Sequence, residues 1–160
     1  MHRLTDFEIK EYHVELQGEI ICFLRKVMPE SGRNLELDGR HSYYKDIFKN
    51  FEKFWCLYDE KKIIGTIAIK YMDKGRCELK SLFLYKEYQG KKLGKFLLST
   101  AIEYAKDKGY VKIYLDTLST SENSIKLYKK TGFVFTDRYN DNQVADVFMV
   151  KELMKEQKIM

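Results

Sequence analysis

The sequence predicts an α/β fold in one domain over residues 1–160, with a mixed, mostly antiparallel central sheet flanked by helices and one β-α-β crossover. Two observations lead to this prediction. Three runs rich in β-branched and aromatic residues lie together in the middle of the chain and are joined by short charged turns. Farther along, a long amphipathic helix separates two apolar segments, and this arrangement favours a right-handed crossover between parallel strands.

The first third of the chain predicts one strand and two helices. Residues 7–12 begin with the alternation that is typical of a strand. Apolar residues then recur at helical spacing from Val14 to Met28, and Pro29 is expected to end that helix. A polar, glycine-containing loop follows, and a second helix is predicted from Tyr43 to Phe54.

Three consecutive antiparallel strands are predicted over residues 54–59, 63–72 and 77–85. The first two are joined by a charged turn that reads as a hairpin. The next turn contains Gly75, which is free to adopt a positive φ. Together these strands form the antiparallel part of the sheet.

The last third predicts a helix, a strand, a second helix and two closing strands. The first helix begins at Leu93 and ends at Gly109, a residue suited to a left-handed C-terminal cap. The strand that follows, over residues 110–117, should lie parallel to the strand before the helix. A helix over 119–132 and strands over 133–139 and 144–153 complete the prediction.

Composition argues against several classes of function. The net charge of +5 comes without a dense basic stripe, so a nucleic-acid partner is not expected. No apolar run is long enough to span a bilayer and no signal peptide is recognised, so we expect a cytoplasmic protein without a membrane partner. Cys22, Cys56 and Cys77 lack metal or redox spacing and are expected to be buried free thiols. The histidines have no ligand spacing, and no metal is expected.

The segment from Gln89 to Lys95 opens the predicted long helix with two glycines and three lysines. Lysine is unfavourable at the positive end of a helix, and no capping residue precedes Leu93. A bound anion such as a phosphate group would satisfy both the free amides and the lysines. The alternative is a solvated surface helix in a lysine-rich protein. The spacing matches neither the P-loop nor the dinucleotide motif, so ATP and NAD are not expected.

Two motifs in this region resemble the GNAT acetyltransferase superfamily. Residues 89–94 are similar to its Arg/Gln-x-x-Gly-x-Gly/Ala segment, with Lys92 in place of the middle glycine. Asn123, Tyr128 and the pair Gly132-Phe133 match a second family segment at the expected separation. The resemblance covers residues 54–153, and it implies a GNAT fold whose two central strands separate in a V-shaped split that holds acetyl-CoA.

The resemblance also implies where acetyl-CoA would bind as co-substrate. Backbone groups of the strand ending at Leu84 would pair with pantetheine, and amides of the lysine-rich loop would hold the pyrophosphate. Asn123 would hydrogen-bond the cofactor, although a first-turn helix cap is the alternative. The implied cofactor-binding residues are Leu82, Phe83, Leu84, Gln89, Gly90, Lys91, Lys92, Leu93, Gly94, Lys95 and Asn123.

Acetyl transfer to an amine needs a proton acceptor and a proton donor, and two residues are candidates. Glu78 is the candidate general base, acting directly or through water; the alternative is a solvent-facing strand residue. Tyr128 resembles the family tyrosine that protonates the sulfur of CoA; the alternative is a core aromatic residue. Candidate substrate-binding residues are Arg33, His41 and Tyr139, whose alternative is a solvated loop.

The expected function is transfer of acetyl from acetyl-CoA to a primary amine of a small molecule, such as an amino acid, by direct attack in a ternary complex. Alternatives are acetylation of a protein lysine or N-terminus, a non-catalytic acyl-CoA-binding module, and nucleic-acid binding through the lysine-rich loops. The closing strand over residues 144–153 also suggests pairing across a homodimer.

Overall fold

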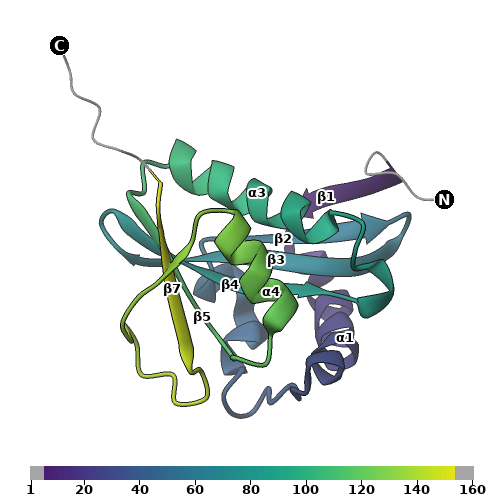
Figure 1. The fold of residues 1–160 in the computed structure, drawn as a ribbon. Coiled ribbons are helices and arrows are strands. Elements are labelled where there is room, and N and C mark those ends of the chain that lie inside the picture. The colour runs from purple at the N-terminus through teal and green to yellow at the C-terminus, as the bar shows by residue number, and fades with distance from the viewer. Residues whose placement is uncertain (1–5, 154–160) are drawn as a thin grey trace.

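The computed structural model describes residues 6–153 as a seven-stranded sheet with helices on both of its faces (Figure 1). The strand order is β1-β2-β3-β4-β5-β7-β6. The pair β4–β5 is parallel and the other neighbours are antiparallel. This confirms the predicted mixed sheet with one β-α-β crossover, in which α3 connects β4 to β5.

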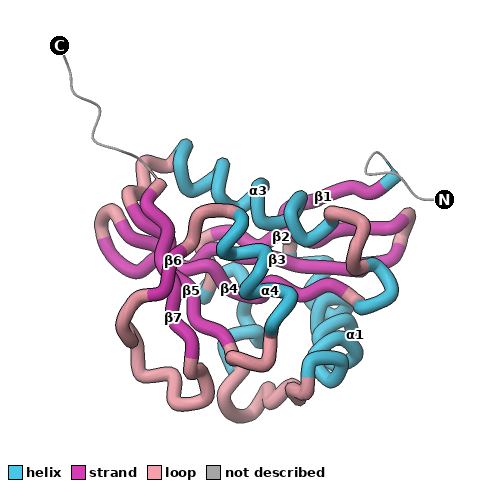
Figure 2. The backbone as a smooth tube through the Cα atoms, viewed as in Figure 1, coloured by secondary structure: helices cyan, strands magenta, loops and turns pink. Residues whose placement is uncertain are grey.

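The strands are β1 (Phe7–Glu11), β2 (Lys53–Asp59), β3 (Lys62–Asp73), β4 (Arg76–Leu84), β5 (Lys112–Thr117), β6 (Val134–Phe135) and β7 (Val147–Glu152). The strand predicted over residues 133–139 is much shorter, because the chain leaves the sheet after β6 and enters a long loop before β7 (Figure 2). The closing strand β7 lies between β5 and β6, so it is not the edge strand of the sheet. Pairing across a homodimer stays a prediction.

The helices are α1 (Gln17–Val27), α2 (Ile47–Asn50), α3 (Leu93–Asp107) and α4 (Glu122–Lys130), with 3-10 turns at Val14–Leu16, Met28–Ser31, Ser42–Asp46 and Lys86–Tyr88. The predicted helix from Tyr43 to Phe54 is confirmed only in part: a 3-10 turn over Ser42–Asp46 and one α-helical turn over Ile47–Asn50 replace one continuous helix, and the last four predicted residues are not helical. Phe51 is already extended, with φ −126° and ψ 143°, and β2 begins two residues later. Pro29 lies in the 3-10 turn that follows α1.

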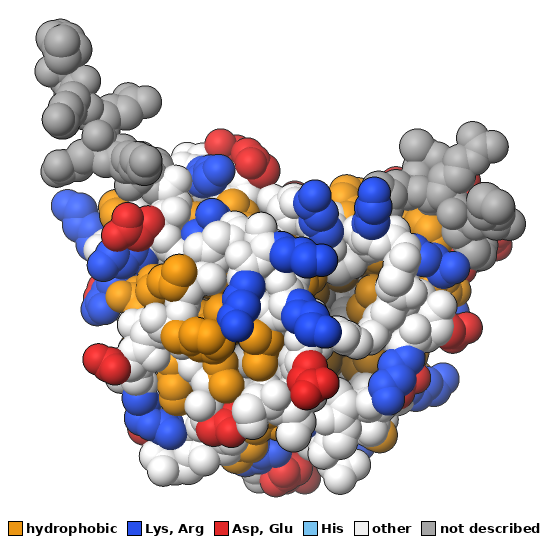
Figure 3. All heavy atoms as spheres, viewed as in Figure 1, with side chains coloured by type: hydrophobic (Ala, Val, Ile, Leu, Met, Phe, Trp, Pro, Cys, Tyr) orange, Lys and Arg blue, Asp and Glu red, His pale blue; other side chains and the backbone are white. Residues whose placement is uncertain are grey.

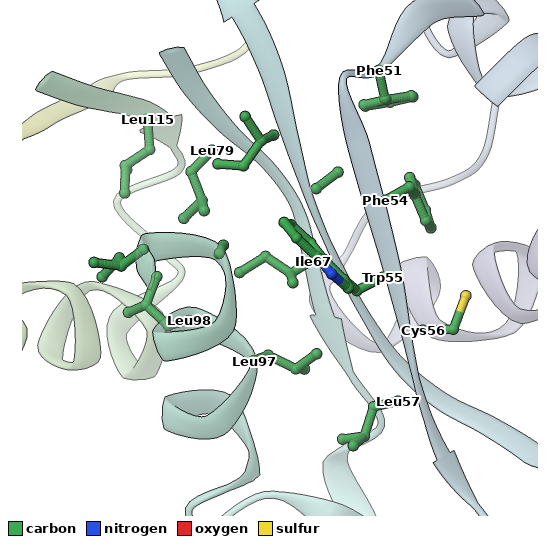
Figure 4. Close-up of a cluster of buried hydrophobic side chains, with 14 of the residues drawn as sticks. Phe51, Phe54, Trp55, Cys56, Leu57, Ile67, Leu79, Leu97, Leu98 and Leu115 are labelled. Carbon is green, nitrogen blue, oxygen red and sulfur yellow. The ribbon is translucent and has the colours of Figure 1, made fainter. Parts of the chain in front are cut away.

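The helices form two layers that enclose the sheet. α3 and α4 cover one face, whereas α1 lies on the other (Figure 1). Successive residues of β2 contact the two layers in turn: the Trp55 ring lies 5.4 Å from that of Tyr104 on α3, while Phe54 packs against Phe51 at 5.3 Å. Figure 4 shows the same division, with Leu97 of α3 on one side of the strands and Phe51 on the other. The sheet is therefore buried on both faces near its centre.

The two central strands separate as the family resemblance implied. β4 pairs with β5 only over residues 76–78 and 112–114, and both strands then continue without pairing to each other. Within β4, Ser81 has a φ of +61°, and the register with β3 shifts at this point. The Thr66 hydroxyl donates to the Ser81 carbonyl at 2.7 Å and so braces the irregular backbone from the β3 side. The opposite edge of β4 faces the split.

Candidate active site

A cavity lies at the split between β4 and β5 and is lined from both faces of the sheet. Ser121 and Tyr128 line it from the α4 side. Arg33 and His41 line it from the connection between α1 and α2, and Asp116 lines it from β5. Because the strands do not pair here, a molecule bound on one face can meet a molecule bound on the other.

The loop that opens α3 presents backbone amides without partners inside the helix. The first helical hydrogen bond runs from the Phe96 amide to the Lys92 carbonyl at 3.1 Å, and no side chain caps the helix. The amides of Leu93, Gly94 and Lys95 therefore have no intrahelical acceptor. Figure 3 shows Lys and Arg side chains gathered over the start of α3 and over α4, so the amides lie in a basic surface. This arrangement suits an anion.

Lys92 adopts the backbone conformation that a glycine adopts readily. Its φ is +66°, in the left-handed region, and Gly90 nearby has a φ of +82°. A side chain is disfavoured there, yet the turn still leads directly into α3. The replacement of the family's middle glycine thus leaves a left-handed turn at this position.

Other residues of the loop have structural contacts. A Cβ on Gly94 would lie 3.2 Å from Cδ2 of Leu127, so this glycine permits close packing of α3 on α4. Leu93 is fully buried and anchors the helix start in the core. The Gln89 side chain donates to the Leu84 carbonyl at 3.2 Å and holds the loop to the end of β4, whereas Lys91 is exposed.

The unpaired edge of β4 lies beside the cavity. Leu82 and Phe83 line the cavity, and Leu84 follows them at the end of the strand. An exposed strand edge can accept an extended amide-containing ligand as an additional strand. Binding of the pantetheine arm by these residues stays a prediction. Asn123 is exposed in the first turn of α4, where its neighbours Ser121 and Ser124 line the cavity. Its contact with a cofactor stays a prediction.

Tyr128 is a buried phenol at the cavity wall. It is 6% exposed and its ring lies 5.7 Å from that of Phe133. Burial raises its pKa, although the charge of Arg33 opposes the increase. The phenol therefore keeps its proton at neutral pH and can donate it. Tyr128 is thus both a core residue and a cavity residue.

Glu78 is buried and hydrogen-bonded. It is 7% exposed, and its Oε2 accepts from the Tyr139 hydroxyl at 2.5 Å and from Nδ2 of Asn140 at 3.2 Å. The same Asn140 nitrogen donates to Oδ2 of Asp116 at 2.6 Å, so one amide links two carboxylates. Lys80 places its Nζ 4.0 Å from Glu78 Oε2. The interpretation of Glu78 as a solvent-facing strand residue is therefore wrong.

The cavity is lined by Lys80 and Asp116 but not by Glu78. Burial alone would lower the pKa of the Lys80 ammonium. The nearby negative charges of Glu78 and Asp116 have the larger combined effect and raise this pKa above its ordinary value. Lys80 is thus a charged group that interacts with both carboxylates. The role of Glu78 as general base stays a prediction.

The predicted substrate-binding residues have different positions. Arg33 donates to Ser31 Oγ at 2.8 Å and to Ser121 Oγ at 3.2 Å, which connects the segment after α1 with the start of α4. Nδ1 of His41 accepts the Glu36 amide at 2.9 Å. Both Arg33 and His41 line the cavity. Tyr139 does not line the cavity, and its hydroxyl donates a hydrogen bond to Glu78 instead.

The electrostatics of His41 indicate a structural contact. Burial lowers the pKa of its imidazole, and the positive charge of Arg40 acts in the same direction. A neutral ring is required for Nδ1 to accept the Glu36 amide. His41 therefore holds its own loop in place at the cavity wall.

Sequence reasoning missed Lys80, Asp116 and Asn140. The first two could have been found, because residues two apart in a strand lie on the same face. Lys80 is two residues after Glu78, and Asp116 is two residues after Tyr114, the β5 residue that pairs with Glu78. Asn140 carried none, because it lies in the irregular loop between β6 and β7.

The cysteines differ from expectation at one position. Cys22 is exposed, because the neighbouring Phe23 and Leu24 occupy the buried stripe of α1. Cys56 and Cys77 are buried, and burial raises the pKa of each thiol to about 12. Neither buried thiol is a ready nucleophile at neutral pH.

Metal-binding clusters and membrane-spanning helices are both absent from residues 6–153. Over this range, no three His, Cys, Asp or Glu side chains gather in an arrangement that could hold a metal ion. Among the helices of the same range, none combines the length and the apolar composition needed to cross a bilayer.

Sequence comparison gives a family match and several relatives. A family model described as "Acetyltransferase (GNAT) family" matches residues 19–133. An uncharacterized N-acetyltransferase of Schizosaccharomyces pombe is 36% identical over 94 residues, which are 58% of this chain and 58% of that protein. Human N-acetyltransferase 8B is 31% identical over 85 residues, 50% of this chain and 37% of that protein. The chain thus spans 37% to 58% of the length of these two relatives.

Solved structures resemble the whole fold. A GNAT-family acetyltransferase from Staphylococcus aureus Mu50 has a TM-score of 0.85 and 25% identity, with coverage of 92% of this chain and 99% of that one. The PaiA N-acetyltransferase of Thermoplasma acidophilum, solved in complex with coenzyme A, has a TM-score of 0.72 and 24% identity, with coverage of 91% and 98%. The family match covers most of the chain and agrees with the split sheet, and the chain therefore belongs to the GNAT acetyltransferase family.

Proposed function

We propose that this protein is an N-acetyltransferase that moves the acetyl group of acetyl-CoA to the primary amine of a small molecule bearing a carboxylate, such as an amino acid, by direct attack in a ternary complex. One observation carries the proposal. The cavity at the β4–β5 split is bordered by the unpaired edge of β4, the strand that leads into the bare start of α3, and is lined on its other side by charged side chains.

The cofactor side offers partners for the amides and for the phosphate groups of coenzyme A. The unpaired edge of β4 offers backbone groups to the amides of pantetheine. The free amides at the start of α3 and the exposed Lys91, Lys92 and Lys95 suit a diphosphate. When bound, acetyl-CoA supplies the acetyl group as a thioester.

The chain's own residues supply the proton transfers. The amine must lose a proton as its nitrogen bonds to the acyl carbon, and the carboxylates Glu78 and Asp116, linked by Asn140, are available to receive it. The sulfur needs a proton as the carbon–sulfur bond breaks. The Tyr128 hydroxyl is a protonated donor at the cavity wall, because burial raises its pKa.

The charges around the cavity support an acceptor with a carboxylate. Arg33, Arg40 and Lys80 line the cavity, and Asp116 is the carboxylate among the lining residues. Such a surface favours a molecule that presents a carboxylate to the arginines and an amine to Asp116. For a lysine-bearing peptide as acceptor, we would expect a wider and more acidic groove.

The proposal is tested with calorimetry and a thiol-release assay on the purified protein. We expect coenzyme A to bind, and amino acids to be turned over with a higher kcat/KM than matched amines without the carboxylate. Faster turnover of peptides would instead indicate a protein acceptor. Coenzyme A binding without turnover of amines, amino acids or peptides would indicate a non-catalytic acyl-CoA-binding module. If coenzyme A gives no heat of binding, the proposal is wrong.

A further inference from the structure

We propose that Asp116, rather than Glu78, is the carboxylate that contacts the acceptor amine, and that Glu78 is a positioning residue. The inference rests on the proposed function, which requires a carboxylate at the acceptor side but does not decide between these two. It concerns access, hydrogen bonding and charge in the cluster formed by Glu78, Lys80, Asp116, Tyr139 and Asn140, called the carboxylate cluster below.

Access differs between the two carboxylates. Asp116 lines the cavity and is partly exposed, on the part of β5 that extends beyond the pairing with β4. Glu78 is the last β4 residue of that pairing and does not line the cavity. Tyr139 covers it from the loop between β6 and β7 through the 2.5 Å hydrogen bond. An amine entering the cavity therefore meets Asp116 first.

Hydrogen bonding also favours Asp116 as the carboxylate that contacts the amine. Glu78 Oε2 already has two donors, the Tyr139 hydroxyl and Nδ2 of Asn140. Within residues 6–153, the Asp116 side chain accepts one hydrogen bond, from Asn140 to Oδ2 at 2.6 Å. This bond fixes the orientation of the carboxylate and leaves Oδ1 to accept a hydrogen bond from an amine.

The charges of the carboxylate cluster leave one negative charge to be matched. Glu78 and Asp116 are two carboxylates, and Lys80 is one ammonium whose Nζ lies 4.0 Å from Glu78 Oε2. Charges removed from water need a partner. Lys80 provides one for Glu78. The charges of Arg33 and Lys80 also act on Asp116, but within residues 6–153 the Asp116 carboxylate forms no ion pair, so an acceptor ammonium would give it a direct partner.

The position of Asp116 also suits the chemistry at the sulfur. Asp116 and Tyr128 line the same cavity. Burial is the main cause of the raised pKa of Tyr128, with Arg33 opposing it, and the charge of Asp116 adds to the increase. The proton acceptor and the proton donor therefore act on one bound pair of substrates.

The proton balance of the step follows from these positions. The bound ammonium first gives one proton to the Asp116 carboxylate, which passes it to solvent, so that a neutral amine remains. The amine nitrogen then forms the new bond to the acyl carbon and gives a second proton to Asp116. The carbon–sulfur bond breaks, and the sulfur takes the Tyr128 proton. Asp116 then loses this proton to solvent and Tyr128 regains one from solvent. The net change is transfer of one proton from nitrogen to sulfur and release of one proton from the ammonium to solvent.

Two isosteric variants separate the roles in steady-state kinetics. We expect Asp116→Asn to lower kcat/KM for the acceptor by about 100-fold, the order of a lost general base, and to remove the acidic limb of its pH profile. Glu78→Gln should lower kcat/KM by about tenfold, because Asn140 or Lys80 would be less well positioned. The pH profile of this variant should keep its acidic limb. Asp141→Asn is the matched control, because this aspartate is exposed beside Asn140 in the loop between β6 and β7 and does not line the cavity.

Coenzyme A affinity should stay unchanged in all three variants. The inference is wrong if Glu78→Gln loses as much activity as Asp116→Asn, if Glu78→Gln loses the acidic limb, or if Asp116→Asn retains nearly full kcat/KM. Comparable folded states are checked by urea unfolding of each variant.

A second measurement does not depend on turnover. In the wild-type protein loaded with coenzyme A, we expect ethylammonium chloride to shift the side-chain carboxyl carbon-13 resonance of Asp116 more than that of Glu78. Tetramethylammonium chloride, which cannot donate a hydrogen bond, should shift neither. A larger shift at Glu78, or no shift at Asp116, overturns the inference. Absence of turnover of every amine would contradict the proposed function, and this titration would still identify the carboxylate that holds the amine.

Discussion

The two ends of the β4–β5 split are built in different ways. At the open end, the loop before α3 presents backbone amides, and within residues 6–153 Lys91, Lys92 and Lys95 form no ion pair. At the closed end, the carboxylate cluster is held by side-chain hydrogen bonds from Tyr139 and Asn140. A site made of backbone tolerates changes of side chain, whereas a network of side chains does not. Substitutions should therefore have large effects near the closed end and small effects at the open end.

The largest effect is expected at Tyr128, which lines the cavity at the split. Tyr128→Phe keeps the ring that packs on Phe133 but removes the hydroxyl that would donate to sulfur. We expect kcat to fall by about 100- to 10,000-fold, the range for loss of a general acid, with coenzyme A affinity unchanged. Stopped-assay kinetics and calorimetry measure the two quantities. A variant with nearly full kcat would show that another group protonates the sulfur.

The same substitution gives a signature in the pH dependence of stability. Burial raises the pKa of Tyr128 above that of an unfolded tyrosine, which is about 10. The stability linked to this raised pKa is fully present below about pH 10 and is lost as the pH rises above it, because the unfolded chain ionises first. Wild type should therefore lose stability relative to Tyr128→Phe above about pH 10 in urea unfolding. An unchanged difference across this range would contradict a raised pKa.

An intermediate effect is expected at Arg33, on the acceptor side of the cavity. Arg33→Met removes a guanidinium from the cavity wall while keeping a long apolar stem. We expect KM for an amino-acid acceptor to rise by about 10- to 100-fold, since hydrogen bonds to charged groups contribute about 1.5–3 kcal/mol. KM for a matched amine without a carboxylate should change little. Arg25→Met, on the exposed face of α1, is the control. Equal losses for both acceptors would mean that Arg33 acts through its bond to Ser121 instead.

The difference between the two ends also explains what the sequence can predict. The residues of the open end are contiguous, so the segment from Gln89 to Lys95 is recognisable as a helix start with free amides from its own residue types. The carboxylate cluster joins Glu78 to Tyr139 and Asn140, which are more than 60 residues away along the chain. Such contacts depend on the course of an irregular loop, and neither periodicity nor a local motif specifies that course.

The central strands and α3 are predictable because their apolar patterns are strong and their ends are marked by turns. The predicted helix from Tyr43 to Phe54 is wrong as one continuous helix, and the reason is physical. Its aromatic residues pack on one another, with the Tyr44 and Phe51 rings 5.7 Å apart, and this packing is compatible with a 3-10 turn followed by one helical turn. Tertiary packing decides the backbone there, and propensity does not.

The smallest effect is expected at Lys92, and it tests whether the open end depends on backbone conformation. Lys92→Gly and Lys92→Ala remove the same ammonium, but only glycine is unstrained at a φ of +66°. The glycine variant should be more stable than the alanine variant by about 1 kcal/mol in urea unfolding, since a left-handed residue with a Cβ costs about that much. Both variants should bind coenzyme A with the same slightly reduced affinity, because an exposed charge contributes less than about 1 kcal/mol. If the alanine variant is the more stable of the two, the left-handed turn is not the conformation at this position in solution.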